Sequence, residues 1–172
     1  MKKRYKTLIA LVAVFAAGFI VPEDRNIPVV GATNADWNKD TFWYEPWGAS
    51  GVHKGVDIFA VKGTAVLSPT NMLVLFNGEI AMGGKVIVGL GAKWRLHYFA
   101  HLESIDDKLG FLLATGDSIG SVGDTGNAKG KPPHLHYSIL SLLPRPWHID
   151  KSTQGYKKAF YIDPIKHMSG SG

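Results

Sequence analysis

The sequence contains no cysteine, and this absence limits its covalent and metal chemistry. No disulfide bond can form. Any metal ion must be held by histidine, aspartate or glutamate side chains, because thiolate ligands are excluded. The lack of cysteine fits an oxidising compartment without requiring one.

Net positive charge is nearly absent after the first six residues. The formal net charge is +5, and four of these charges come from Lys2, Lys3, Arg4 and Lys6. The rest of the chain therefore carries +1 and has no basic stripe, which is the usual mark of a nucleic-acid-binding surface. This distribution predicts no nucleic-acid partner.

An uncharged apolar run, Thr7–Val21, follows the basic residues. A basic segment before an apolar run is typical of an export signal. The run is shorter than the ~20 residues of a full membrane span, and Ala16-Ala17-Gly18 offers small residues for cleavage. Residues 1–21 are therefore predicted to form either a cleaved signal peptide or an N-terminal membrane anchor, with residues 7–21 as the tether. A buried core helix is a third interpretation.

Long helical periodicity is absent from the body of the chain, and its 20 glycines favour turns over helices. Short runs of β-branched, aliphatic and aromatic residues between turn residues predict strands instead. The predicted strands are Thr64–Leu67, Met72–Asn77, Lys85–Leu90, Trp94–His101, Ser118–Val122 and His134–Leu140. The pattern predicts one all-β domain, mainly antiparallel, with a barrel or sandwich architecture.

The placement of the seven histidines is the most informative feature of the sequence. If the segment around residue 55 is extended, His53, Gly55 and Asp57 share one face, because side chains alternate along a strand. The bare glycine leaves that face open, so the two flanking side chains could hold one ion. The pair alone is a weak signal.

A second pair, His134 and His136, projects to one face of a predicted strand. Two imidazoles on one strand face are seldom a packing device, since they repel when protonated and need partners when neutral. A metal ion supplies such a partner. At the end of another predicted strand, alternation places His97 and His101 on one face.

Catalytic zinc usually takes three protein ligands and keeps a fourth position for water. His53, Asp57 and His136 make a set of two nitrogens and one oxygen, which leaves His101 and His134 free nearby. A zinc-bound water could then attack an amide carbonyl. One neutral histidine would take its proton, and a second would stabilise the oxyanion or protonate the leaving amine. No His-Glu-x-x-His motif supplies a glutamate base.

Together these segments resemble the lysostaphin-type, or LytM-type, zinc endopeptidases, which act on bacterial peptidoglycan. That family carries a His-x-x-x-Asp motif, an isolated histidine in an Ala-His-Leu context, and a later His-x-His motif. The corresponding residues here are, in order, His53 and Asp57, Ala100-His101-Leu102, and His134 and His136. The likeness covers roughly Trp47 to Met168.

The resemblance implies that His53, Asp57 and His136 bind one zinc ion per chain, and that His101 and His134 form the catalytic pair. It implies an all-β, mainly antiparallel fold of the two-sheet barrel-sandwich, or duplicated hybrid motif, type with the active site in a groove between the sheets. It also implies a metalloendopeptidase that hydrolyses peptide cross-links or bridges of peptidoglycan.

The chain is accordingly expected to have four regions. Residues 1–21 form the signal peptide or anchor, 22–40 a linker or N-terminal extension, 41–168 the peptidase domain, and 169–172 a flexible tail. Export places the protein in the cell envelope, either in the periplasm or outside the cell. An uncleaved anchor would hold it at the inner membrane.

Two other functions are compatible with these residues. A catalytically silent LytM-type domain would bind or activate another cell-envelope enzyme, although such domains usually lose ligands that this chain keeps. A histidine phosphocarrier would use two neighbouring histidines, but an export signal does not suit a cytosolic carrier. The metalloendopeptidase, acting as a monomer on peptidoglycan peptides, is the favoured interpretation.

Overall fold

The computed structural model describes residues 2–170, so Ser171 and Gly172 of the predicted flexible tail lie outside the described residues. An α-helix lies at each end of this part of the chain, α1 (Lys2–Ile20) and α2 (Pro164–Met168). The strands between them are β1 (Val56–Phe59), β2 (Ala65–Leu67), β3 (Met72–Ile80), β4 (Gly84–Gly91), β5 (Arg95–Ile105), β6 (Leu112–Leu113), β7 (Ser118–Val122), β8 (His134–Ser141) and β9 (Tyr161–Ile162). Short 3-10 helices are η1 (Gly48–Ser50), η2 (Ala92–Trp94), η3 (Gly126–Ala128), η4 (Pro146–His148) and η5 (Gly155–Ala159).

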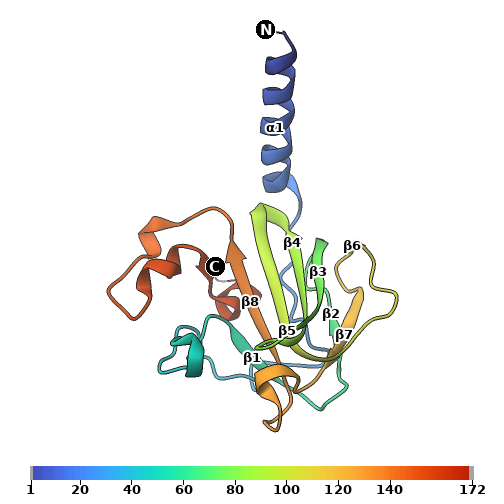
Figure 1. The fold of residues 1–172 in the computed structure, drawn as a ribbon, viewed down its shortest axis with the longest axis vertical. Helices are drawn as coiled ribbons and strands as arrows, with labels where there is room; N and C mark the ends of the chain where they lie inside the picture. Colours follow the sequence, from blue (N-terminus) through green and yellow to red (C-terminus); the bar gives the residue numbers. More distant parts are fainter. Residues whose placement is uncertain (1, 171–172) are drawn as a thin grey trace.

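All the strand pairings in the described chain are antiparallel, which confirms the mainly antiparallel β prediction. The strands form a single nine-stranded sheet with the central order β1-β8-β5-β4-β3-β6 (Figure 1). Strand β7 pairs with β2 and β5, and β9 pairs with β8. This single sheet differs from the predicted pair of sheets.

The long strand β5 explains why the sheet is continuous. One edge of β5 pairs with β4. The other edge pairs with β8 from Arg95 to Ala100 and then with β7 from Leu102 to Ile105. Because one strand carries both pairings, the hydrogen-bonded ladder is not divided into two sheets.

His101 is the residue at which β5 changes partner. Its backbone φ is +64°, in the left-handed region that few residues other than glycine adopt. This conformation reverses the alternation of side chains along the strand. His97 is fully buried on the core face, whereas the ring of His101 lies 5.1 Å from that of His134. The prediction that His97 and His101 share a face is therefore wrong, since it assumed a regular strand.

The segment 22–40, predicted as a linker, contains no helix or named strand but packs against the sheet. Val29 and Trp37 are buried and belong to the hydrophobic core, and Val29 forms an isolated β-bridge with Val66. The side chain of Glu23 is only 2% exposed, and it pairs with Arg95 at 2.6 Å and Lys93 at 3.0 Å. These contacts fix the start of the segment to the sheet.

Helix α1 projects away from the body of the protein (Figure 1). Its contact with η2 is a stack of Phe15 on Trp94, with ring centroids 6.0 Å apart, and the indole N–H of Trp94 donates to the carbonyl oxygen of Phe15 at 3.0 Å. Residues 4–17 are exposed, so the buried-core-helix interpretation is wrong. Among residues 2–170, no helix has the length and apolar character needed to cross a membrane.

Candidate metal centre

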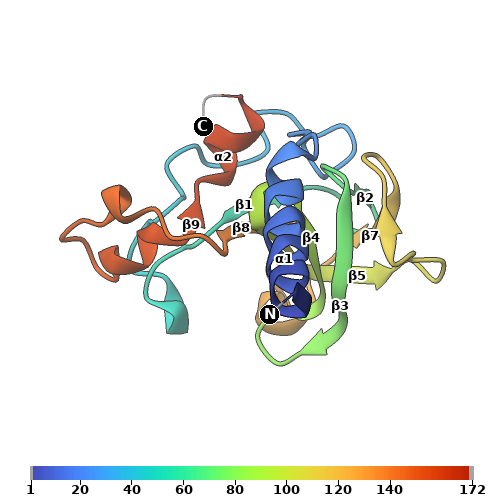
Figure 2. The same ribbon diagram turned by 90° about the horizontal axis from the view of Figure 1, so that it is seen from above.

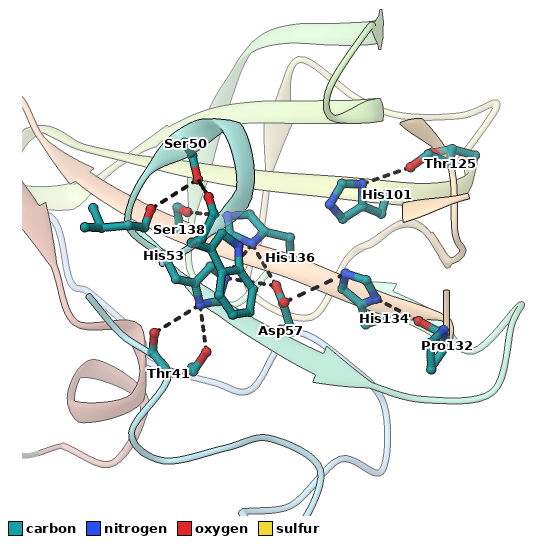
Figure 3. Close-up of polar contacts among 12 residues, drawn as sticks. Thr41, Ser50, His53, Asp57, His101, Thr125, Pro132, His134, His136 and Ser138 are labelled. Atoms are coloured by element: carbon teal, nitrogen blue, oxygen red, sulfur yellow. Dashed lines mark hydrogen bonds and ion pairs between the residues drawn. The ribbon is translucent and has the colours of Figure 1, made fainter. Parts of the chain in front are cut away.

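The pairing of β1 with β8 brings the first candidate ligands together. Asp57 lies directly opposite His136 in this antiparallel pair, and side chains of opposite residues lie on the same face. His53 precedes β1, and its backbone is fixed by hydrogen bonds with residues 43 and 44. The predicted ligands of the two separate motifs therefore meet on one side of the sheet (Figure 3).

The three candidate ligand atoms form a small triangle. Nε2 of His53 lies 3.1 Å from Oδ1 of Asp57 and 3.1 Å from Nδ1 of His136, and the last two atoms are 2.8 Å apart. Within residues 2–170, these side chains are the one group of three or more histidine and acidic residues whose ligand atoms all lie within 4.8 Å of one another. Tetrahedral zinc with bonds of about 2.0 Å separates its ligand atoms by roughly 3.3 Å, so the triangle has a suitable size.

In both His53 and His136, the imidazole nitrogen that points away from the triangle has a hydrogen-bond partner. A hydrogen on this outer nitrogen leaves the inner nitrogen with a lone pair for a metal ion. Nδ1 of His53 lies 2.7 Å from the hydroxyl and 3.1 Å from the carbonyl oxygen of Thr41. The carbonyl oxygen can only accept, so a hydrogen on Nδ1 would satisfy it and leave Nε2 free for a metal ion. Nε2 of His136 lies 2.9 Å from the hydroxyl of Ser138. A proton on Nδ1 of His136 could form a hydrogen bond with only one neighbour, either Nε2 of His53 or Oδ1 of Asp57. A metal ion would contact all three atoms at once. The donor set therefore fits a cation.

The ionisation states of two of these side chains also suit a metal. Burial would raise the pKa of Asp57, but the adjacent imidazoles of His136 and His53 outweigh burial and hold this pKa well below its usual range. Burial lowers the pKa of His136 despite the opposing effect of Asp57. An anionic carboxylate and a neutral imidazole are the forms that bind zinc.

The other two predicted residues, His134 and His101, lie beside the triangle with their rings 5.1 Å apart (Figure 3). Nδ1 of His134 donates to the carbonyl oxygen of Pro132 at 2.8 Å, and Nδ1 of His101 donates to that of Thr125 at 2.9 Å. Both rings therefore have a free Nε2 lone pair. Nε2 of His134 is 3.9 Å from Oδ2 of Asp57.

Burial lowers the pKa of His101 to about 4. The positive charges that His134 and His136 carry when protonated add to this effect. Thr125 holds this ring in two ways. Its carbonyl accepts from His101, and its hydroxyl donates to the carbonyl of Leu102 at 2.9 Å, which ties η3 to the strand beside the histidine. His101 is thus a neutral, oriented imidazole near neutral pH.

Three residues that surround the centre were not identified from the sequence: Thr41, Thr125 and Ser138. A fourth neighbour, Trp47, stacks its ring on that of His53 with centroids 4.1 Å apart. Ser138 continues the period-two pattern of β8, so alternation could have identified it. Thr41 and Thr125 reach the histidines through irregular segments, for which the sequence contains no comparable signal.

Gly55 lets β1 approach β8 closely. A Cβ added there would lie 2.5 Å from both the carbonyl oxygen of Tyr137 and the hydroxyl of Ser138.

We expect Gly55→Ala to separate the strands, lower the free energy of unfolding by about 1–3 kcal/mol, and weaken zinc binding roughly tenfold or more. Denaturant unfolding and zinc titration measure both effects. In Gly130→Ala a Cβ meets nothing within 4 Å, but the φ of +79° strains an alanine, so this variant is a control for zinc affinity only and should leave it unchanged. An equal loss of zinc affinity in both variants would contradict this role.

His97 lies outside the candidate metal centre and is part of the buried core. Its Nδ1 lies 2.7 Å from the hydroxyl of Tyr137. Burial, reinforced by the charge of His167, lowers the pKa of His97 to about 3. The unfolded state therefore binds the additional proton between pH 6.5 and about 3, and stability falls as pH decreases through this range.

We expect His97→Gln to reduce the acid sensitivity of the fold. The slope that His97 contributes is about 1.4 kcal/mol per pH unit, and glutamine removes it while offering Tyr137 a hydrogen-bond partner. Free energies of unfolding measured between pH 4 and 7 should therefore vary less in the variant. An unchanged slope would mean that His97 does not stay neutral when buried.

Comparison with known proteins identifies a family and several relatives. The model of peptidase family M23 matches residues 51–148. The L-Ala–D-Glu endopeptidase of Bacillus subtilis (strain 168) is 36% identical over 113 residues, which are 60% of this chain and 35% of that protein. Lysostaphin of Staphylococcus simulans is 32% identical over 92 residues, which are 52% of this chain and 18% of that protein.

The fold is also similar to a solved structure. The catalytic domain of lysostaphin from Staphylococcus simulans superposes with a TM-score of 0.55 and 25% identity, covering 72% of this chain and 85% of that domain. The chain spans about a third or less of the length of the curated relatives it matches. The shared region contains all five predicted site residues.

Proposed function

Because this chain belongs to peptidase family M23, we propose that it is a zinc-dependent endopeptidase that hydrolyses peptide cross-links or bridges of bacterial peptidoglycan. The observation that carries the proposal is the triangle of His53, Asp57 and His136, whose ligand atoms are 2.8–3.1 Å apart. The name of one relative, the L-Ala–D-Glu endopeptidase of Bacillus subtilis, supports peptide bonds as the substrate.

His53, Asp57 and His136 would hold one zinc ion per chain. Zinc, when bound, polarises a carbonyl group and makes water more acidic near neutral pH. The protein's contribution is to keep the ligands oriented. Thr41 contacts the outer nitrogen of His53, and Ser138 contacts the outer nitrogen of His136; such outer contacts set ligand direction and basicity.

His134 and His101 would move the protons. The free Nε2 of one imidazole accepts a proton from the attacking water. That Nε2, once protonated, would pass the proton on to the leaving amine. The other imidazole would donate to the oxyanion from Nε2 only while it carries a second proton, because Nδ1 holds the first. Their backbone partners keep the opposite nitrogen protonated, so each ring presents the same atom to the substrate throughout.

The basic start of the chain and the exposed apolar surface of α1 support an exported protein in the cell envelope, tethered to a membrane through residues 7–21. In this arrangement the domain of residues 41–168 remains close to the bilayer. The peptidoglycan strands nearest to that bilayer would then be its substrate.

The test is zinc content and wall digestion measured on one detergent-solubilised preparation of the full chain. We expect one bound zinc and release of soluble peptide fragments from purified peptidoglycan, abolished by chelation and restored by zinc. Zinc binding without fragment release from several wall types would favour a catalytically silent domain that activates another envelope enzyme. A chain that binds no zinc would overturn the proposal.

A further inference from the structure

The apolar surface of α1 surrounds the helix and does not form one stripe. Its exposed large apolar side chains are Leu8, Ile9, Leu11, Val12, Val14, Phe15, Phe19 and Ile20. A stripe would indicate packing against one protein face, whereas a helix that is apolar all round requires an apolar environment on every side. Apart from the contact of its C-terminal half with Trp94, the body of the protein does not provide that environment.

A second apolar surface lies on the body of the protein. We define the β6 patch as Leu75, Phe76, Phe111 and Leu112. Phe111 and Leu112 are 69% and 74% exposed, which is unusual for large apolar residues in a folded domain. A hollow of about 420 Å³ is lined by Leu75, Phe76 and Phe111, so these residues of β3 and of the segment before β6 lie next to one another.

The β6 patch is continuous with the base of α1. A second hollow, of about 260 Å³, is lined by Gly18 and Val21 at the end of the helix, by Trp94, and by Leu112 of the patch. Figure 1 shows β6 at the end of the sheet from which α1 projects, and the view along the helix places β3 and β4 beside it (Figure 2). The helix and the patch therefore face one apolar environment.

The charges at the tip of α1 indicate what that environment is. Lys2, Lys3, Arg4 and Lys6 precede the apolar run, and basic residues beside an apolar helix favour anionic lipid. Trp94 lies at the base of the helix with an apolar ring and a polar N–H, the kind of side chain that is common at membrane–water interfaces.

We propose that the β6 patch is a lipid-binding surface that lies on an anionic phospholipid bilayer beside α1. This inference rests on the membrane tether in the proposed function and does not depend on catalysis. Two contacts, the helix and the patch, orient the domain, whereas a single tether would let it rotate freely.

The strand directions in the sheet determine where the metal centre would lie relative to the bilayer. β5 begins at Arg95 beside η2 and α1, and His101 follows about 20 Å further along at ~3.3 Å per residue. β8 runs in the opposite direction, so Ser141 pairs with Arg95 and His136 pairs with Ala100. Through its pair with Leu73, Leu112 of the β6 patch is level with Leu96 near the start of β5. A bilayer on this end of the patch would therefore leave the metal centre further along β5, away from lipid.

The absence of cysteine makes a site-specific test direct, because one introduced cysteine gives one labelling site. Full-length Leu112→Cys, Leu11→Cys and Lys129→Cys would each be labelled with the environment-sensitive fluorophore NBD. Leu112 represents the β6 patch, Leu11 represents α1, and Lys129 is an exposed residue beside η3 at the other end of the sheet. Each protein would be mixed with vesicles of phosphatidylcholine and phosphatidylglycerol.

We expect the labels at positions 112 and 11 to shift to shorter emission wavelengths and to be quenched by nitroxide-labelled lipid, while the label at position 129 stays water-like. If position 11 enters lipid and position 112 does not, α1 is a simple tether and the β6 patch does not bind lipid. If neither enters lipid, both the tether and the patch are wrong. Quenching at position 129 would overturn the proposed orientation. None of these readouts depends on peptide hydrolysis, so they remain independent of the enzymatic proposal.

Discussion

His136→Ala should lose bound zinc and, with it, all measurable hydrolysis of peptidoglycan. This residue supplies the atom closest to Asp57, at 2.8 Å, and also contacts His53 at 3.1 Å. Its removal leaves two ligands, which are too few for a catalytic zinc site. Loss of a residue that only supports a ligand typically weakens metal affinity 10–100-fold, so loss of the ligand itself should weaken it more than about 100-fold.

The measurement is zinc affinity by competition with a chromophoric chelator, together with fragment release from purified wall. Ser138→Ala is the graded comparison, because it removes only the hydroxyl beside Nε2 of His136. It should keep zinc with an affinity roughly tenfold lower. His148→Ala removes an exposed histidine outside the centre and should change neither quantity. Stoichiometric zinc in His136→Ala would show that the ligand set is wrong.

Local sequence patterns predicted the strands well. Each of the six predicted strands overlaps an observed one, and Ser118–Val122 agrees at both ends. β1 was considered only as a possible extended segment, and the two-residue strands β6 and β9 were missed, since two residues do not establish a periodicity. The single sheet was also missed, because partner choice by β5 depends on contacts between segments distant in sequence.

Metal ligands and the surrounding contacts differ in how far the sequence predicts them. His134 and His136 share a face because β8 is regular, so the period of two was sufficient. His101 was placed near the centre by the ligand count and by the family resemblance, since strand alternation gave it the wrong neighbour. Its φ of +64° depends on the turn at Gly83, which accepts its backbone N–H, and on Thr125, which accepts its side chain. Those partners come from other parts of the chain.

His134→Ala and His101→Ala should both keep zinc and lose most activity. Neither ring belongs to the ligand triangle, and each has a free Nε2 directed by a backbone carbonyl. Positioned acid–base groups typically contribute 10²–10⁴-fold to rate, so we expect kcat to fall by that range with zinc affinity within a few-fold of the parent. His97→Gln is the matched control at pH 7, because it alters a buried histidine outside the centre.

The double variant decides whether the two histidines act together. Residues that serve one proton-transfer sequence show strongly non-additive losses. If His101 and His134 act on the same substrate molecule, the double variant should be little slower than the slower single variant. Losses that multiply would mean that the two rings contribute independently. If either single variant loses zinc along with activity, that histidine is a ligand or a structural support, and the division between triangle and catalytic pair does not hold.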